Sequence, residues 1–136
     1  MPKKILCATD GTAHSETAVE FAAKLAKATD ATLTYVSVAP YTVDRGGVWP
    51  LWSDEEVAEK LDSAAQVAEK LGVTSVNRIE IKARDVAGAI LLCADKTEAD
   101  LVVVGTRNRG ALPRLLGGSV SNEVTNKSHI PVTVVR

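Results

Sequence analysis

The feature that most constrains the fold is a run of four apolar residues, Leu101-Val102-Val103-Val104, that opens directly into a glycine-containing loop. Strands of antiparallel sheets commonly alternate apolar and polar residues, because one face meets water. A strand with no polar residue is instead covered on both faces. The run therefore predicts a central strand of a parallel sheet that carries helices on both sides.

The rest of the chain alternates between strand and helix patterns. These patterns predict strands at 3–9, 31–38, 76–83, 101–104 and 131–135, and helices at 15–28, 53–71, 85–99 and 119–128. The alternation favours one α/β domain over residues 1–136, a three-layer α/β/α open sheet of five parallel strands in the order 3-2-1-4-5. Ligands of such sheets bind at the carboxyl ends of the strands where the order reverses, here between the first and fourth strands.

The longest segment expected to be irregular is 40–53, which contains two prolines, two glycines and both tryptophans, Trp49 and Trp52. A loop of this length in a compact domain is usually functional or mobile. The alternative is that the tryptophans pack the loop onto the body, since aromatic rings are common packing anchors. The segment ends at Ser53, which forms a capping box with Glu56 at the start of the next helix.

Composition excludes several classes of protein. Of the 136 residues 46% are hydrophobic and the formal net charge is −1, which rules out a disordered chain and does not indicate nucleic-acid binding. No apolar run approaches the ~20 residues of a membrane span, and no signal-peptide pattern precedes the first strand. Cys7 and Cys93 lie in strand and helix patterns, which predicts two buried, reduced thiols in a cytoplasmic protein.

Residues 105–119 place glycines, three arginines and a closing serine between the central strand and the start of a helix. Glycines let backbone N–H groups approach an anion, and a helix N-terminus adds unpaired N–H groups and a partial positive charge. The segment therefore predicts a phosphate site. It is not a P-loop, because Ala111 and Leu112 follow Gly110 where Lys and Ser or Thr are required. No G-x-G-x-x-G sequence supports a dinucleotide site of the usual kind.

These motifs resemble those of the universal stress protein family, in which G-x2-G-x9-G-[ST] follows the fourth strand and an aspartate ends the first. Gly105, Gly118 and Ser119 match the loop pattern, and Asp10 matches the aspartate. Both ends of the chain are also typical, so the resemblance covers essentially all of it. One position departs, because Asn108 replaces the second glycine to give G-x2-N-x9-G-S. Asparagine tolerates positive φ, so the loop conformation can persist, while its side chain could donate to a phosphate or crowd it.

The resemblance implies a Rossmann-like fold of the adenine nucleotide α-hydrolase-like type with an ATP or AMP site. Asp10 would accept from the ribose hydroxyls, Val38 would offer backbone groups to adenine, and Ser119 would bond a phosphate. Simpler roles stay open: Asp10 as a turn cap, Ser119 as an N-cap, and Arg107 and Arg109 as solvated side chains rather than phosphate ligands. The implied contact residues are Ala8, Thr9, Asp10, Val38, Val104, Gly105, Thr106, Arg107, Asn108, Arg109, Gly110, Ala111, Gly118, Ser119, Val120 and Ser121.

The implied function is that of a cytoplasmic stress-response protein that binds ATP, or AMP, as a regulatory ligand, with Mg²⁺ as a candidate co-ligand beside Asp10. A homodimer is implied through the C-terminal strand, 131–136. The alternative is a nucleotide-independent, homodimeric interaction module of the same fold. An enzyme is not favoured, because no general base beside a nucleophile can be named, and His14 and His129 lack the spacing of a metal site or triad.

Overall fold

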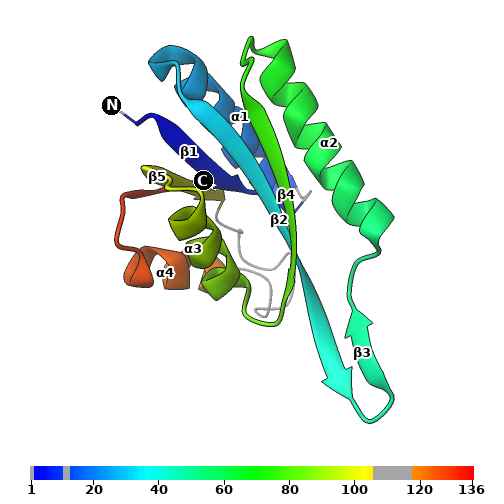
Figure 1. Ribbon diagram of the computed structural model, residues 1–136. Coiled ribbons are helices and arrows are strands. Elements are labelled where there is room, and N and C mark those ends of the chain that lie inside the picture. Colours follow the sequence, from blue (N-terminus) through cyan, green and yellow to red (C-terminus); the bar gives the residue numbers. More distant parts are fainter. Residues whose placement is uncertain (1, 11–12, 106–117) are drawn as a thin grey trace.

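The computed structural model describes residues 2–10, 13–105 and 118–136, with the backbone alone at 13, 14, 118 and 119. Its helices and strands alternate along most of the chain (Figure 1). Among the described helices, none combines the length and the apolar character needed to cross a membrane. The elements are β1 (Lys4–Ala8), α1 (Ala13–Thr29), β2 (Thr32–Asp44), β3 (Gly47–Pro50), α2 (Asp54–Lys70), β4 (Val76–Ala83), α3 (Val86–Lys96), β5 (Leu101–Gly105), α4 (Gly118–Lys127) and β6 (Val132–Val135).

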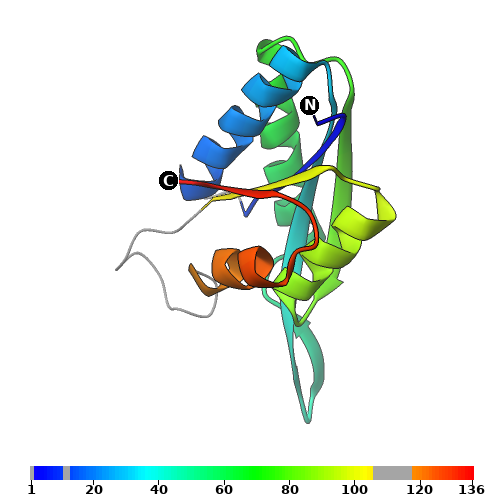
Figure 2. The same cartoon turned by 90° about the vertical axis from the view of Figure 1, so that its left-hand side faces the viewer.

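The parallel part of the sheet has the strand order β4-β2-β1-β5-β6. Among the parallel strands this order matches the expected 3-2-1-4-5, because β4, β5 and β6 are the third, fourth and fifth parallel strands along the chain. The sheet has six strands and not the expected five, because β3 also pairs with β2. Helices α1 and α2 cover one face of the sheet, and α3 and α4 cover the other (Figures 1 and 2). The three-layer α/β/α class predicted from the sequence is therefore confirmed.

The core is densest at the two central strands. Ile5 and Cys7 of β1 point into the α1/α2 layer, whereas Leu6 points into the α3/α4 layer, as the alternation of a strand requires. In β5, Val102 and Val103 are both fully buried. The run 101–104 is thus covered on both faces, as its lack of polar residues predicts. Both cysteines are free and buried.

The expectation that 40–53 is irregular is wrong. Strand β2 continues to Asp44, and β3 returns antiparallel to it as a hairpin that projects from the body (Figures 1 and 2). Asp44 fixes the turn, since its Oδ1 accepts hydrogen bonds from Gly46 N at 2.7 Å and from Trp49 Nε1 at 2.9 Å. Gly47 has a φ of +128°, which favours glycine. Here β-branched and aromatic residues outweigh the prolines and glycines that indicated a loop.

The helix after the hairpin begins as predicted. Ser53 Oγ accepts from Glu56 N at 3.1 Å, and Glu56 Oε1 accepts from Ser53 N at 3.0 Å, so the capping box is confirmed. Gly72 follows α2 with a φ of +90°. These local signals fix the two ends of α2, which packs against β2 and β4.

Candidate functional site

Hydrogen bonds fix the carboxyl end of β1 to β2 and to α1. Thr9 N donates to Val36 O at 2.9 Å, which extends the β1–β2 ladder by one residue. The Thr9 and Ser15 hydroxyls are 3.1 Å apart, and Asp10 N donates to Ser15 Oγ at 3.3 Å. Thr9 and Ser15 are buried, whereas Asp10 is only partly buried. Asp10 therefore stands at the rim of the sheet, on a backbone that α1 holds in place.

Along the edge of β2 that faces β1, the backbone hydrogen bonding is interrupted after the point where β1 ends. Val36 O accepts from Thr9 N, and Pro40 O accepts from Leu51 N, also at 2.9 Å. Alternate residues of a strand direct their backbone groups to the same edge, so 36, 38 and 40 share this one. Val38 lies between the two bonded positions, after the last β1 pair at Val36 and before the first β3 pair at Tyr41, so among the described residues it has no partner strand at this edge. We call this position the ladder break.

Beside the end of β1 and the edge of β2, the candidate site is bordered by β5 and α4. Cys7 pairs with Val103, so the parallel register sets Ala8 and Thr9 beside Val104 and Gly105. Val104 is 3% exposed, and Gly105 is the last residue of β5. Helix α1 leaves β1 toward one face of the sheet, whereas α4 lies on the opposite face (Figure 2). The helices that follow β1 and β5 therefore lie on opposite faces of the sheet, and sheets of this kind bind ligands between two such strands.

The structure brings together only part of the predicted site. Ala8, Thr9, Asp10, Val104 and Gly105 lie at the carboxyl ends of β1 and β5, and Val38 lies in β2 two residues beyond the Ala8–Val36 pair. In the first turns of α4, Val120 packs against the α3/α4 core and Ser121 is 5% exposed. Gly118 and Ser119 are placed as the first residues of α4. The remaining predicted contacts, Thr106, Arg107, Asn108, Arg109, Gly110 and Ala111, lie outside the described residues.

Sequence reasoning missed Lys60, whose charge is close enough to that of Asp10 for the two to interact. Lys60 of α2 places its Nζ 3.3 Å from the centroid of the Trp52 ring. Trp52 packs against the α1/α2 core, whereas Trp49 on the hairpin is 52% exposed. Burial lowers the pKa of Lys60, and the carboxylates of Glu56 and Asp10 oppose that shift. The packing role foreseen for the tryptophans therefore holds for Trp52 alone. No spacing in the sequence connects Lys60 to Asp10.

A buried hydroxyl lies behind the same end of the sheet. Ser37 is fully buried, and within the described part of the chain its Oγ has no hydrogen-bond partner. Leu33, Tyr35 and Ala39 of β2 belong to the α1/α2 core, so the alternation of the strand turns Ser37 toward that core as well. It adjoins the Thr9–Ser15 pair, because Thr9 follows the Ala8–Val36 pairing.

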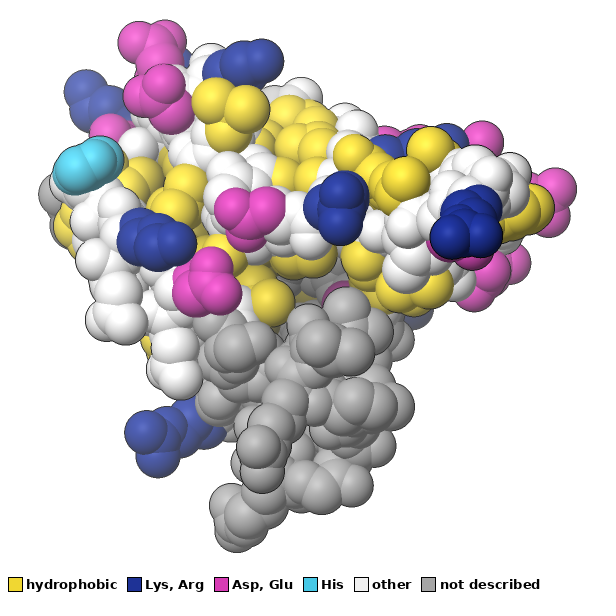
Figure 3. Space-filling model, turned by 90° about the horizontal axis from the view of Figure 1, so that it is seen from below, with side chains coloured by type: hydrophobic (Ala, Val, Ile, Leu, Met, Phe, Trp, Pro, Cys, Tyr) yellow, Lys and Arg dark blue, Asp and Glu magenta, His cyan; other side chains and the backbone are white. Residues whose placement is uncertain are grey.

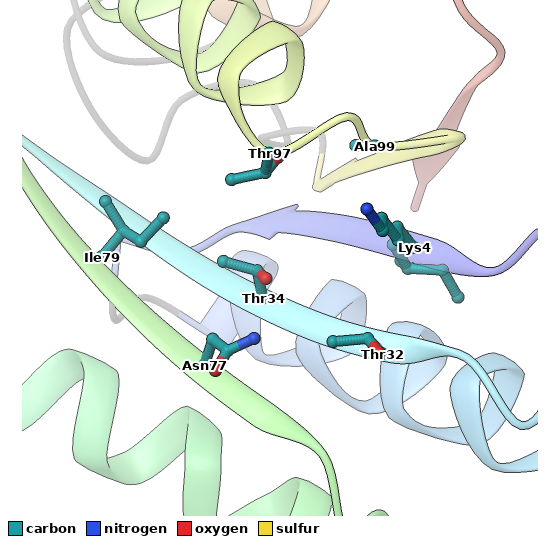
Figure 4. Close-up of a pocket in the computed structure, with 8 residues that line it drawn as sticks. Lys4, Thr32, Thr34, Asn77, Ile79, Thr97 and Ala99 are labelled. Carbon is teal, nitrogen blue, oxygen red and sulfur yellow. The ribbon is translucent and has the colours of Figure 1, made fainter.

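A separate cleft of about 310 Å³ opens at the other end of the strands (Figure 4). Three threonines, an asparagine and Lys4 supply its polar atoms, and Lys4 is paired with Glu98 at 3.6 Å. This cleft lies at the amino ends of β1 and β2 and shares no residue with the predicted site. Its lining is Lys4, Ile5, Thr32, Thr34, Asn77, Ile79, Thr97 and Ala99.

The hairpin carries exposed apolar side chains. Tyr41 faces Pro50 and Val43 faces Val48, and directly paired residues share one face of a ribbon. Val43 is 50% exposed and Val48 is 60% exposed. Seen from the end of the molecule at which the hairpin projects, apolar side chains lie at the surface next to charged ones (Figure 3).

The sequence model of the universal stress protein family matches residues 1–136. The chain belongs to the universal stress protein family. A universal stress protein of Thermus aquaticus is 36% identical over 140 residues, with all of both chains covered. One from Methanocaldococcus jannaschii is also 36% identical, over 98% of this chain and 82% of the relative.

Solved universal stress proteins share the fold. One, determined in complex with cAMP, superposes with a TM-score of 0.76 and is 28% identical. The match covers 99% of this chain and 97% of that one. The chain thus belongs to a family in which one solved member was determined in complex with cAMP.

Proposed function

We propose that this universal stress protein binds an adenine nucleotide at the carboxyl ends of β1 and β5 and beside Val38 of β2, with ATP as the ligand. The ladder break supports this proposal most directly. It leaves the backbone N–H and C=O of Val38 between Thr9 and Leu51. A purine edge, which presents donors and acceptors side by side, can take the place of the missing strand there. The family member solved with cAMP supports the same ligand class.

The other parts of the nucleotide follow from this placement. Asp10 accepts from the ribose hydroxyls, and the phosphates extend over Gly105 toward the N-terminus of α4. That helix is 10 residues long and begins with Gly118 and Ser119, so its N-terminal N–H groups favour an anion. The loop arginines, which lie outside the described residues, favour a triphosphate over a monophosphate. Mg²⁺ accompanies the triphosphate, with Asp10 as one protein ligand.

The nucleotide acts as a regulatory ligand in a stress response and not as a substrate. Its binding shifts the population of conformations and with it the choice of partner. The protein works in the cytoplasm as a homodimer that pairs through 131–136. Two free, buried cysteines fit a reducing compartment. β6 fits the dimer, because within the described residues it pairs with β5 alone and Val134 is 39% exposed.

Calorimetric titration with ATP, AMP and adenosine, with and without Mg²⁺, tests the proposal. Asp10→Asn should weaken ATP binding about tenfold, because a hydrogen bond to a charged acceptor contributes about 1.5–3 kcal/mol. Asp95→Asn, at an exposed position of α3, is the matched control and should bind as the wild type does. Gly118→Val should abolish binding by steric contact at the phosphates. Wild-type protein that gives no heat with any of the three ligands would refute the proposal.

The second candidate is an interaction module that needs no nucleotide. The half-exposed Val43 and Val48 on the projecting hairpin favour it, since exposed apolar patches commonly mark protein contacts. Light scattering and partner capture, each with and without ATP, distinguish the two. Assembly and capture that are indifferent to ATP support this candidate, whereas a dependence on ATP supports the sensor.

A further inference from the structure

The cleft at the amino ends of β1 and β2 takes no part in the proposed nucleotide site. Leu6 and Val36 belong to the α3/α4 core, and Lys4 and Thr34 lie two residues before them, so the alternation of the strands turns all four to the same face of the sheet. On this face α3 has 11 residues, whereas α1 and α2 on the other face have 17 each. The cleft opens beside the C-cap of α3, Thr97.

Thr34 is the most buried polar side chain of the cleft. It is 7% exposed, and within the described part of the chain its hydroxyl forms no hydrogen bond. Figure 4 shows Thr34 and its cross-strand partner Asn77 on adjoining strands, with Thr97 and Ala99 across the cleft from them. A hydroxyl taken from water without a partner is unfavourable, so a ligand that pairs with Thr34 removes this cost.

The other neutral polar groups of the cleft can also pair with a ligand. The side chains of Thr32 and Asn77 form no hydrogen bond within the described residues. The Thr97 hydroxyl donates to Cys93 O at 2.8 Å, so its oxygen can still accept. Threonine hydroxyls and the asparagine amide both donate and accept hydrogen bonds. Ligand hydroxyls do the same, and they therefore suit this lining better than a phosphate or carboxylate, which only accepts.

The charges at the cleft do not favour an anion. Among the described residues that line it, Lys4 alone is charged. Its Nζ lies 3.6 Å from Glu98 Oε1. The carboxylate of Asp100 accepts hydrogen bonds from the backbone N–H groups of Lys3 and Lys4, at 2.8 and 2.9 Å. Two carboxylates thus adjoin Lys4, and the cleft offers an anion no net positive charge.

We propose that this cleft binds a neutral polyhydroxylated molecule of about the size of a monosaccharide. Its volume of about 310 Å³ is at the lower end of the range of small-molecule sites, about 300–1,000 Å³. Ligand hydroxyls pair with Thr32, Thr34 and Asn77, and the C–H groups of the ligand pack against Ile79 and Ala99. The cleft shares no residue with the nucleotide site, so the inference goes beyond the proposed function and does not depend on it.

Titrations followed by the NMR shifts of the backbone amides test the inference, with glucose, myo-inositol and inorganic phosphate as probes. At least one of the two polyols should give saturable shifts at the residues that line the cleft, with a Kd of about 1 mM, whereas phosphate should give none there. Thr34→Val removes the buried hydroxyl and should weaken binding about threefold to tenfold, the loss of one hydrogen bond. Asn77→Ala, at an exposed position, should weaken it about threefold. Thr42→Val, in the same strand but on the hairpin, is the matched control and should bind as the wild type does.

Three results would overturn the inference. The first is the absence of saturable shifts at the cleft with either polyol at concentrations tenfold above the expected Kd. The second is binding of phosphate there in place of the polyols, which would make the cleft an anion site. The third is equal affinity of Thr34→Val, Asn77→Ala and Thr42→Val, which would place the polyol elsewhere. If Thr34→Val fails to fold by circular dichroism, Asn77→Ala decides. ATP titrated in the same way tests the nucleotide function separately, because its shifts should fall at the carboxyl ends of β1 and β5.

Discussion

Replacing Ser37 with alanine should stabilise the protein. The side chain is fully buried, and its Oγ has no hydrogen-bond partner within the described residues. A buried polar group without a partner costs about 1–3 kcal/mol of desolvation, and this cost disappears with the hydroxyl. The substitution removes the packing contacts of one oxygen atom, and the free energy lost with them is below the ~0.8 kcal/mol of a buried methylene group. The removed desolvation cost exceeds the lost packing, so we expect the free energy of unfolding to rise by about 1 kcal/mol and Tm by about 4 °C.

Ser15→Ala is the matched control, because Ser15 is also buried but its hydroxyl is engaged. It lies 3.1 Å from Thr9 Oγ1 and accepts from Asp10 N at 3.3 Å. The same substitution there leaves buried partners unsatisfied and should cost about 1–2 kcal/mol. The two serine variants should therefore move the urea midpoint in opposite directions, with equal slopes.

The refuting result is a Ser37→Ala protein that is destabilised as much as Ser15→Ala. It would mean that the Ser37 hydroxyl is satisfied in solution, for example by a buried water that bonds several polar groups at once. The reasoning from an unpartnered hydroxyl would then fail, and the region behind β1 and β2 would have to be treated as a hydrated polar pocket.

Two further predictions concern stability. Gly88→Ala should give none of the ~1 kcal/mol by which alanine usually stabilises a helix relative to glycine. The new Cβ would lie 2.9 Å from Cγ of the Asp85 carboxylate and would disturb a helix cap that contributes a similar free energy. A gain of the full ~1 kcal/mol in urea unfolding would contradict this. Asp100→Asn should destabilise the protein at pH 7 but not at low pH. Hydrogen bonds from the backbone N–H groups of Lys3 and Lys4 lower the Asp100 pKa below its ordinary 3.8, so its contribution is complete above that value and disappears as the pH falls through the folded pKa. A difference that persists unchanged at pH 2 would show that the charge of Asp100 is not involved.

The parts of the fold that follow from local chemistry could be predicted from sequence. The run 101–104 has no polar residue, so only a central, doubly covered strand suits it, and the same burial is seen in the structure. The capping box at Ser53 and Glu56 needs only residues three apart. The parallel order follows because alternating strands and helices with right-handed crossovers leave few arrangements.

The hairpin and the Lys60 contact could not be predicted in the same way. In 40–53 the prolines and glycines indicate a loop, but Pro40 still provides the carbonyl that receives Leu51 N, and glycines at the turn permit the reversal. Lys60 lies over Trp52 and within range of the charge of Asp10 only because β1, β2 and α2 are folded together, so no local spacing in the sequence indicates it. The roles of the loop after Gly105 rest on residues outside the described part and remain predictions.

The proposed site exists because neighbouring strands differ in length. β1 has 5 residues and β2 has 13, so the edge of β2 that faces β1 runs on unpaired until the hairpin returns to it, while β4 pairs with the other edge. The ladder break at Val38 depends on where that return ends, because bonds at 36 and 40 leave the residue between them without a partner strand at this edge. If β3 extended two residues further along β2, its backbone would pair with Val38 and close the break. The turn at Asp44, which sets the register of β3, is therefore a condition for the binding site although it lies outside it.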